Sequence, residues 1–153
     1  MLREDVRSTW ERGSQELIVV VEEGNIILRY TSSFGPDSSC DQSFYFYLTP
    51  DEAETLWHLA ELVLLVPAEN IPGLFLRIGD KIDVHVYERN FLPHMALEHI
   101  RFGGEVEYFF SIVLDRSEIA ALAAGLEKAL SLVRNGEACH ECSEAYRVGT
   151  EGN

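Results

Sequence analysis

An aromatic strand that runs directly into a capped amphipathic helix occurs twice in the chain, and this repeat constrains the fold more than any other feature. The first copy is SFYFYLTPDEAETLWHLAELVLLV at residues 43–66, and the second is EYFFSIVLDRSEIAALAAGLEKALSLV at residues 107–133. An alignment that sets Leu48 on Leu114 also pairs apolar positions of the two helices, namely Leu56 with Leu122, Ala60 with Leu126 and Leu64 with Leu130. We therefore interpret the chain as a duplicated strand-and-helix unit.

Each helix is preceded by the sequence signature of a helix N-terminus. Thr49 is followed three residues later by Glu52, and Asp115 is followed three residues later by Glu118. A side-chain oxygen at the first position and a carboxylate at the fourth can satisfy backbone N–H groups that the first turn of a helix leaves free. The two signatures predict helices over 50–66 and 116–133.

The segments before each helix have the alternation and β-branched content of strands. They predict strands at 16–22, 26–31 and 43–48 in one half, and at 74–78, 81–87, 95–102 and 105–114 in the other, with loops at 32–42 and 88–94. Short hairpin connections favour antiparallel pairing. The sequence therefore predicts an α+β fold with about seven antiparallel strands in two related repeats (about 16–66 and 74–133), helices packed on the sheet, and a short N-terminal helix over 2–12.

The length and composition fit one globular domain. The chain has 153 residues, of which 46% are hydrophobic and 25% are charged, and this is enough apolar material for a substantial core. We expect a single domain over residues 1–136, followed by a polar and flexible tail over residues 137–153.

The charge and the targeting signals restrict the function further. The net charge is −14, from 26 acidic and 12 basic residues. Phosphate contacts need clustered Lys and Arg, so this charge argues against a generic nucleic-acid binder and favours a basic protein partner. Residues 1–16 are charged throughout, no apolar run is long enough to span a bilayer, and there are three cysteines. We expect a cytoplasmic protein with reduced thiols.

The predicted order of strands and helices resembles that of the Whirly and PUR families of single-stranded-DNA-binding regulators, in which a strand meander closed by a helix is repeated. The resemblance covers residues 16–133 at the level of topology, and it implies a sheet face that binds single-stranded nucleic acid. The chain also resembles small acidic immunity proteins that neutralise bacterial toxins, many of which alternate strand hairpins with a capped helix. That resemblance agrees with the charge and implies inhibition of a basic partner.

The most conspicuous candidate for metal binding is the sequence Cys139-His140-Glu141-Cys142. Two cysteines separated by two residues can present both sulfurs to one Zn²⁺ or form a redox pair. A structural zinc site needs four ligands, so the others would come from Cys40 or from a histidine at 85, 94 or 99. The alternative is a C-terminal tail with incidental thiols.

Three histidines fall within fifteen residues, and two of them, His85 and His99, lie on neighbouring predicted strands. If their side chains faced each other, they could form a metal or proton-transfer site with a nearby carboxylate from Asp83, Glu88 or Glu98. The alternative is that these histidines are ordinary residues of a solvent-exposed sheet face.

A candidate binding face combines aromatic and basic residues of the predicted strands. Tyr45 and Tyr47, with Phe109 from the second repeat, could form a platform on which bases or a ligand stack. Several cations lie in or next to strands, namely Arg29, Arg77, Lys81, Arg89 and Arg101. Segment 74–104 is nearly neutral within a very acidic chain, which favours a nucleic-acid face there. The alternative is a sheet buried on both sides, since aromatic residues are common in strands.

No catalytic motif stands out, so an enzyme is not the expected class. The sequence has no G-x-S-x-G motif and no phosphate-binding loop. We expect a non-catalytic acidic binding or regulatory protein that acts by protein–protein contact, inhibitory or immunity-like toward a basic partner. The alternatives are a single-stranded nucleic-acid-binding regulator and a zinc-binding module. Unpaired strand edges also favour a homo-oligomer.

Overall fold

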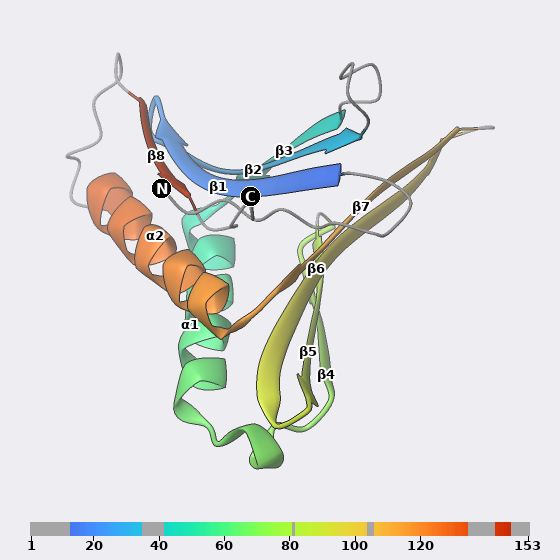
Figure 1. The fold of residues 1–153 in the computed structure, drawn as a ribbon. Helices are drawn as coiled ribbons and strands as arrows, with labels where there is room; N and C mark the ends of the chain where they lie inside the picture. Colours follow the sequence, from blue (N-terminus) through green and yellow to red (C-terminus); the bar gives the residue numbers. More distant parts are fainter. Residues whose placement is uncertain (1–12, 35–41, 81, 104–105, 135–142, 148–153) are drawn as a thin grey trace.

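The described part of the protein forms two antiparallel sheets and two long helices, as the computed structural model shows (Figure 1). The structure describes residues 13–34, 42–80, 82–103, 106–134 and 143–147. The predicted α+β class and the antiparallel pairing are confirmed. Among the described residues, no helix has both the length and the apolar character needed to cross a membrane.

The first sheet has the strand order β3-β2-β1-β8. Its strands are β1 (Gly13–Glu22), β2 (Asn25–Phe34), β3 (Gln42–Leu48) and β8 (Ser143–Arg147). The β1–β2 hairpin turns through Glu23 and Gly24, whose φ angles of 51° and 80° suit a tight turn that continues the twist of the strands. Both strands are longer than predicted, since β1 begins at Gly13 and β2 continues to Phe34.

Strand β8 corrects the prediction of a featureless tail. Ser143–Arg147 pairs antiparallel with β1, in a register that sets Val20 opposite Ala145. The sequence of this strand has no apolar alternation, so periodicity gives no signal for it. Its structure comes from the pairing itself, in which the backbone N–H and C=O groups at the edge of β1 find partners.

The second sheet has the strand order β4-β5-β6-β7. Its strands are β4 (Leu74–Ile78), β5 (Ile82–Arg89), β6 (Leu92–Gly103) and β7 (Val106–Leu114). The predicted loop over 88–94 is wrong, because β5 and β6 are joined by a two-residue turn at Asn90 and Phe91. Pro93 suggested a loop, but it lies in the strand next to the turn and pairs with Glu88.

Both predicted helices are confirmed, and both begin as their sequence signatures predict. Helix α1 spans Pro50–Leu65, where Thr49 Oγ1 accepts from the backbone N–H of Glu52 (3.1 Å) and Glu52 Oε1 accepts from that of Thr49 (2.9 Å). Helix α2 spans Arg116–Arg134, and Asp115 and Glu118 make the same reciprocal pair at 3.0 and 2.8 Å. A short 3₁₀ turn, η1 (Ala68–Asn70), leads from α1 towards β4.

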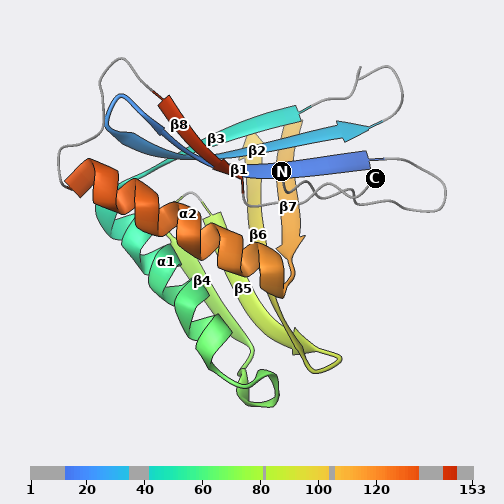
Figure 2. The same cartoon turned by 60° about the vertical axis from the view of Figure 1, so that its left-hand side comes forward.

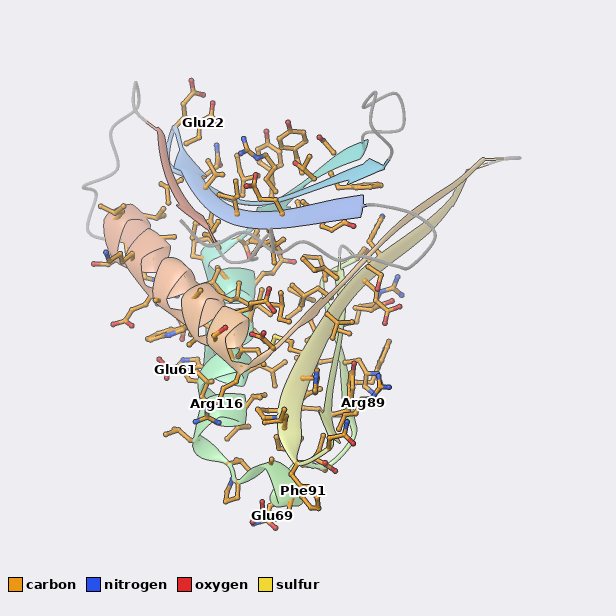
Figure 3. The ribbon with its side chains drawn as sticks, in the orientation of Figure 1. Glu22, Glu61, Glu69, Arg89, Phe91 and Arg116 are labelled. Carbon is orange, nitrogen blue, oxygen red and sulfur yellow. The ribbon has the colours of Figure 1, made fainter. Side chains whose placement is uncertain are left out.

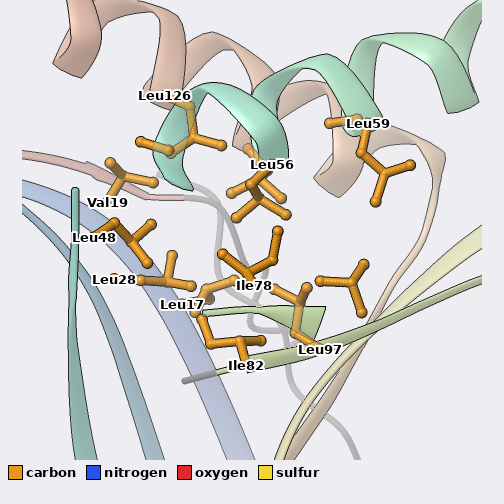
Figure 4. Close-up of a cluster of buried hydrophobic side chains, with 14 of the residues drawn as sticks. Leu17, Val19, Leu28, Leu48, Leu56, Leu59, Ile78, Ile82, Leu97 and Leu126 are labelled. Atoms are coloured by element: carbon orange, nitrogen blue, oxygen red, sulfur yellow. The ribbon is translucent and has the colours of Figure 1, made fainter. Parts of the chain in front are cut away.

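One hydrophobic cluster joins both sheets and both helices. The two sheets lie at a steep angle to each other, and the helices pack side by side in the space between them (Figures 1 and 2). The cluster draws on the inner face of each sheet and one side of each helix (Figure 4), with Leu17, Leu28, Leu56, Leu97 and Leu126 among its members. The helices therefore cover only one face of each sheet.

The two sheets also touch each other directly. The Tyr30 hydroxyl on β2 donates to the carbonyl oxygen of Ser111 on β7 (3.4 Å). The Phe46 ring on β3 meets the His99 ring on β6 edge-on, with centroids 5.1 Å apart. These contacts fix the angle between the sheets on the side away from the helices.

In each sheet a meander of consecutive strands runs into a helix, with β1-β2-β3 leading to α1 and β4-β5-β6-β7 leading to α2. In the first sheet the outermost strand, β8, comes from the far end of the chain. The shared element order agrees with a duplicated unit, although the duplication itself stays a prediction. The predicted helix over 2–12 lies outside the described residues.

Candidate functional site

The outward face of the second sheet, which neither helix covers (Figure 1), carries a row of aromatic side chains. The centroids of Phe75 and His85 are 6.4 Å apart, and those of His85 and Tyr87 are 5.1 Å apart. Tyr87 and His94 stack almost in parallel, at 5.4 Å and 9°. We call the outward residues Phe75, His85, Tyr87, Leu92, His94 and Val113 the aromatic face.

The strand alternation places these side chains there. Ile82, Val84 and Val86 of β5 point into the core and are buried, so Asp83, His85 and Tyr87 point outward. The register then brings outward residues of β4 and β6 beside them, with Phe75 opposite His85 and His94 opposite Tyr87. Phe75 is 65% exposed.

The aromatic face is balanced in charge. Arg77 and Asp83 face each other in register and form an ion pair (Nε–Oδ1 3.4 Å). Segment 74–104 contains four basic and four acidic residues, namely Arg77, Lys81, Arg89, Arg101, Asp80, Asp83, Glu88 and Glu98. The charge of −14 is therefore carried entirely by the rest of the chain.

The tip of the β5–β6 hairpin extends this face with an exposed phenylalanine. Phe91 has a φ of +63° and is 78% exposed (Figure 3). A bulky residue in the left-handed region is rare, because Cβ approaches the following carbonyl oxygen. The turn is held in part by Glu88, whose Oε2 accepts from the backbone N–H of Phe91 (2.6 Å). The turn thus holds a bulky residue in an unfavourable backbone conformation, with its apolar ring exposed to solvent.

The sequence-predicted binding residues do not gather on one surface. Tyr45 and Tyr47, each 57% exposed, share the outward face of the first sheet with Arg29, which pairs in register with Tyr45. Arg77 and His85 lie instead on the outward face of the second sheet. The prediction that these five residues form a single aromatic and basic platform is therefore wrong. The side chains of Arg101 and Phe109 lie outside the described residues.

The predicted pairing of His85 with His99 is also wrong. His85 lies opposite Ala96 and points outward, whereas His99 follows Leu97 on the inner side of β6 and contacts Phe46. An alternation of period two separates the two rings onto opposite faces. Within the described residues, no three His, Cys, Asp or Glu side chains are grouped as metal ligands would be. The zinc candidates Cys40, Cys139 and Cys142 lie outside those residues.

The acidic residues of α1 mostly have structural roles. Glu52 caps the helix, and Glu61 accepts from the indole N–H of Trp57 (3.1 Å). Glu54 forms an ion pair with Arg134 at the end of α2. The hydrogen bond and the charge of Arg134 hold the pKa of Glu54 below its ordinary value of 4.5. These carboxylates secure the helix and its contact with α2, as expected of a solvated helix face.

Two of the hollows between described elements are lined by no acid–base pair. The larger, about 330 Å³, lies where α1 begins and is lined by Gly24, Asn25, Ile26, Tyr47, Leu48, Thr49, Pro50 and Val133. The smaller, about 60 Å³, is apolar and is lined by Leu59, Leu62, Val63, Val66, Ile71, Pro72, Leu74 and Val86. Both suit contact with a surface better than acid–base chemistry.

Sequence reasoning missed Phe75, Phe91 and Leu92 as surface features. The alternation of β5 does predict that His85 and Tyr87 share a face. The position of Phe75 beside them depends on the register of β4, and the exposure of Phe91 depends on the tight turn that was predicted as a loop. No known protein family matches the chain, and neither does any curated protein.

Proposed function

We propose that this protein is a non-catalytic binding protein that recognises another protein through the aromatic face and the Phe91 tip. The observation that carries the proposal is the set of large apolar side chains exposed together on a sheet face that neither helix covers. Contiguous exposed apolar patches of this kind mark interaction sites in soluble proteins. Aromatic residues are also enriched at the centres of protein interfaces.

The exposed rings supply the free energy that such a contact needs. Burial stabilises by about 25 cal/mol per Å² of apolar surface, so covering a side chain as exposed as Phe75 or Phe91 contributes roughly 1–2 kcal/mol. The left-handed backbone at Phe91 supports the same conclusion, because strained conformations collect at functional sites.

The charge distribution favours a basic partner. The chain carries −14 in total, while the segment that contains most of the aromatic face is neutral. A negative field around a neutral contact area steers a cationic protein towards that area. The contact area itself has no cluster of like charges that would lose hydration on binding. This agrees with an inhibitory or immunity-like role toward a basic target, which we place in the cytoplasm because the chain has few cysteines.

The proposal is tested by capturing partners from an extract of the source cells at about 0.05 and 0.5 M salt. We expect a basic partner that is retained by the wild type at low salt and lost by the variant Phe75→Ser/Tyr87→Ser. The matched control is Tyr45→Ser/Tyr47→Ser, which removes two equally large rings from the other sheet. The proposal fails if the wild type retains no basic protein, or if only the control variant loses it.

A second candidate is a single-stranded nucleic-acid-binding regulator, which the stacked pair of Tyr87 and His94 favours. Bases stack on aromatic rings whatever their sequence, and a charge-neutral strand face does not repel phosphates. This candidate predicts that a fluorescent oligonucleotide gains anisotropy on binding, and that the binding weakens steeply with salt. No change in anisotropy at low salt would dispose of it.

A further inference from the structure

The four edge strands of the two described sheets differ in how well they are protected against pairing. Natural edge strands avoid association by being short, or by carrying charges or proline. Strand β8 has five residues with Glu144 and Arg147, and β4 has five residues with Arg77, directly after Pro72 and Gly73. Strand β7 carries Glu107 near its start, and in the uncharged stretch that follows, the Ser111 carbonyl already accepts from Tyr30 of the other sheet.

Strand β3 is the exception. Gln42–Leu48 has seven residues and contains no charge, no proline and no glycine. It pairs with β2 over its whole length, and no other described strand pairs with its second edge. Its side chains alternate regularly, with Tyr45 and Tyr47 exposed outward and Phe46 and Leu48 buried inward. This edge therefore has the features of a pairing site.

We propose that β3 is a homodimer interface, at which a second copy of the chain adds its own β3 antiparallel to the first. We take the occupant to be a second copy, because β3 carries no charge that a foreign strand would have to complement, and an antiparallel pair of β3 strands is closed by a twofold axis. In a register that places the outward side chains of both strands on the same side of the joined sheet, tyrosines of the two copies lie opposite each other. The opposed pairs are Tyr45 with Tyr45 or Tyr45 with Tyr47. The two first sheets then form one continuous sheet.

The charge of the chain determines how this contact responds to salt. Two copies that each carry −14 repel one another, while the strands that meet are uncharged. Salt screens the long-range repulsion and leaves the neutral contact unchanged, so association strengthens as salt rises. The contact with a basic partner changes in the opposite direction, which separates the two interfaces experimentally.

The test is the molar mass at about 100 µM protein in 0.05 and 0.5 M NaCl, by light scattering on a sizing column. We expect the mass to rise above 17.3 kDa towards twice that value, and more so at high salt. Tyr45→Lys should weaken the dimer about tenfold, because it brings like charges together across the paired strands. Phe75→Lys, the same kind of change on an exposed edge strand of the other sheet, should leave the dimer intact.

A second variant on the same edge, Ser43→Lys, repeats the test at another exposed position, and circular dichroism confirms that each variant is folded. A monomer at both salt concentrations overturns the proposal. So does a dimer that Phe75→Lys disrupts and the two β3 variants do not. Failure here leaves the function proposed above untouched, since Tyr45→Lys should still capture the basic partner at low salt.

Discussion

The two helix N-termini offer a matched pair of substitutions, Asp115→Ala and Thr49→Ala. Both remove the side chain that caps a helix, and both leave the glutamate of the capping box in place. The two sites differ in the capping group, which is a carboxylate that also accepts from Ser117 at α2 and a hydroxyl at α1. We expect Asp115→Ala to destabilise the protein more than Thr49→Ala at neutral pH.

The magnitudes follow from the contacts of each cap. Loss of a capping side chain costs about 1 kcal/mol, which is the whole effect expected for Thr49→Ala. Asp115 Oδ1 accepts from the backbone N–H of Glu118 (3.0 Å) and from the hydroxyl of Ser117 (2.9 Å). Its charge at a helix N-terminus adds about 0.3–1 kcal/mol. We therefore expect about 1.5–2 kcal/mol for Asp115→Ala, or a fall in Tm of roughly 3–8 °C for a domain of this size.

The losses of stability in Asp115→Ala and Thr49→Ala should also depend differently on pH. Burial alone would raise the pKa of Asp115, but the hydrogen bonds from Glu118 and Ser117 outweigh it and hold the pKa below its ordinary value of 3.8. A carboxyl whose pKa is lowered by folding stabilises the fold at pH values above its pKa in the unfolded state. This contribution is lost as the pH falls through its pKa in the folded state. The cost of Asp115→Ala should therefore shrink below about pH 3.8, while that of Thr49→Ala persists.

Urea unfolding followed by circular dichroism at pH 7, 5 and 3.5 measures both variants against the wild type. An Asp115→Ala variant that loses less than about 0.3 kcal/mol at pH 7 would show that α2 does not begin with this cap. An equal loss at all three pH values would show that the charge of Asp115 contributes nothing.

Three further predictions concern single side chains. Leu56→Ala should cost about 2–5 kcal/mol in urea unfolding, whereas Leu65→Ala, on the exposed side of the same helix, should stay within about 0.5 kcal/mol. Phe91→Gly should stabilise the protein by about 0.5–1 kcal/mol, by relieving the left-handed backbone, and should weaken partner capture; a destabilised variant would contradict the strain. Glu54→Gln should lower Tm at pH 7, but the difference should vanish as pH falls below 4.5 and through the lowered pKa of Glu54; a constant difference would refute the ion pair with Arg134.

The local signals in the sequence predicted most of the fold. Thr49 and Asp115 marked the starts of both helices, because capping depends only on residues within one turn. Strand β8 could not be found in this way, since its five residues have no apolar alternation and become a strand by pairing with β1. The tight turn at Asn90 and Phe91 was missed for a related reason, because Phe is an unusual residue for positive φ and Pro93 suggested a loop.

The candidate site was harder to predict, because it depends on strand register. His85 and His99 were correctly placed on neighbouring strands, but the register sends them to opposite faces. Tyr45 and Arg77 were grouped by composition, yet they belong to different sheets. The packing of the helices decides which aromatic side chains remain exposed, and local sequence patterns do not predict that packing.

Site-specific photo-crosslinking tests the central claim most directly. A benzophenone side chain is placed at position 75 on the aromatic face, at position 91 on the hairpin tip, or at position 124 on the exposed side of α2. Each protein is irradiated in an extract of the source cells at low salt. We predict that positions 75 and 91 yield a covalent adduct with the same basic protein and that position 124 does not. An adduct from position 124 alone would contradict the assignment of the aromatic face as the recognition surface, as would the absence of any adduct from 75 and 91.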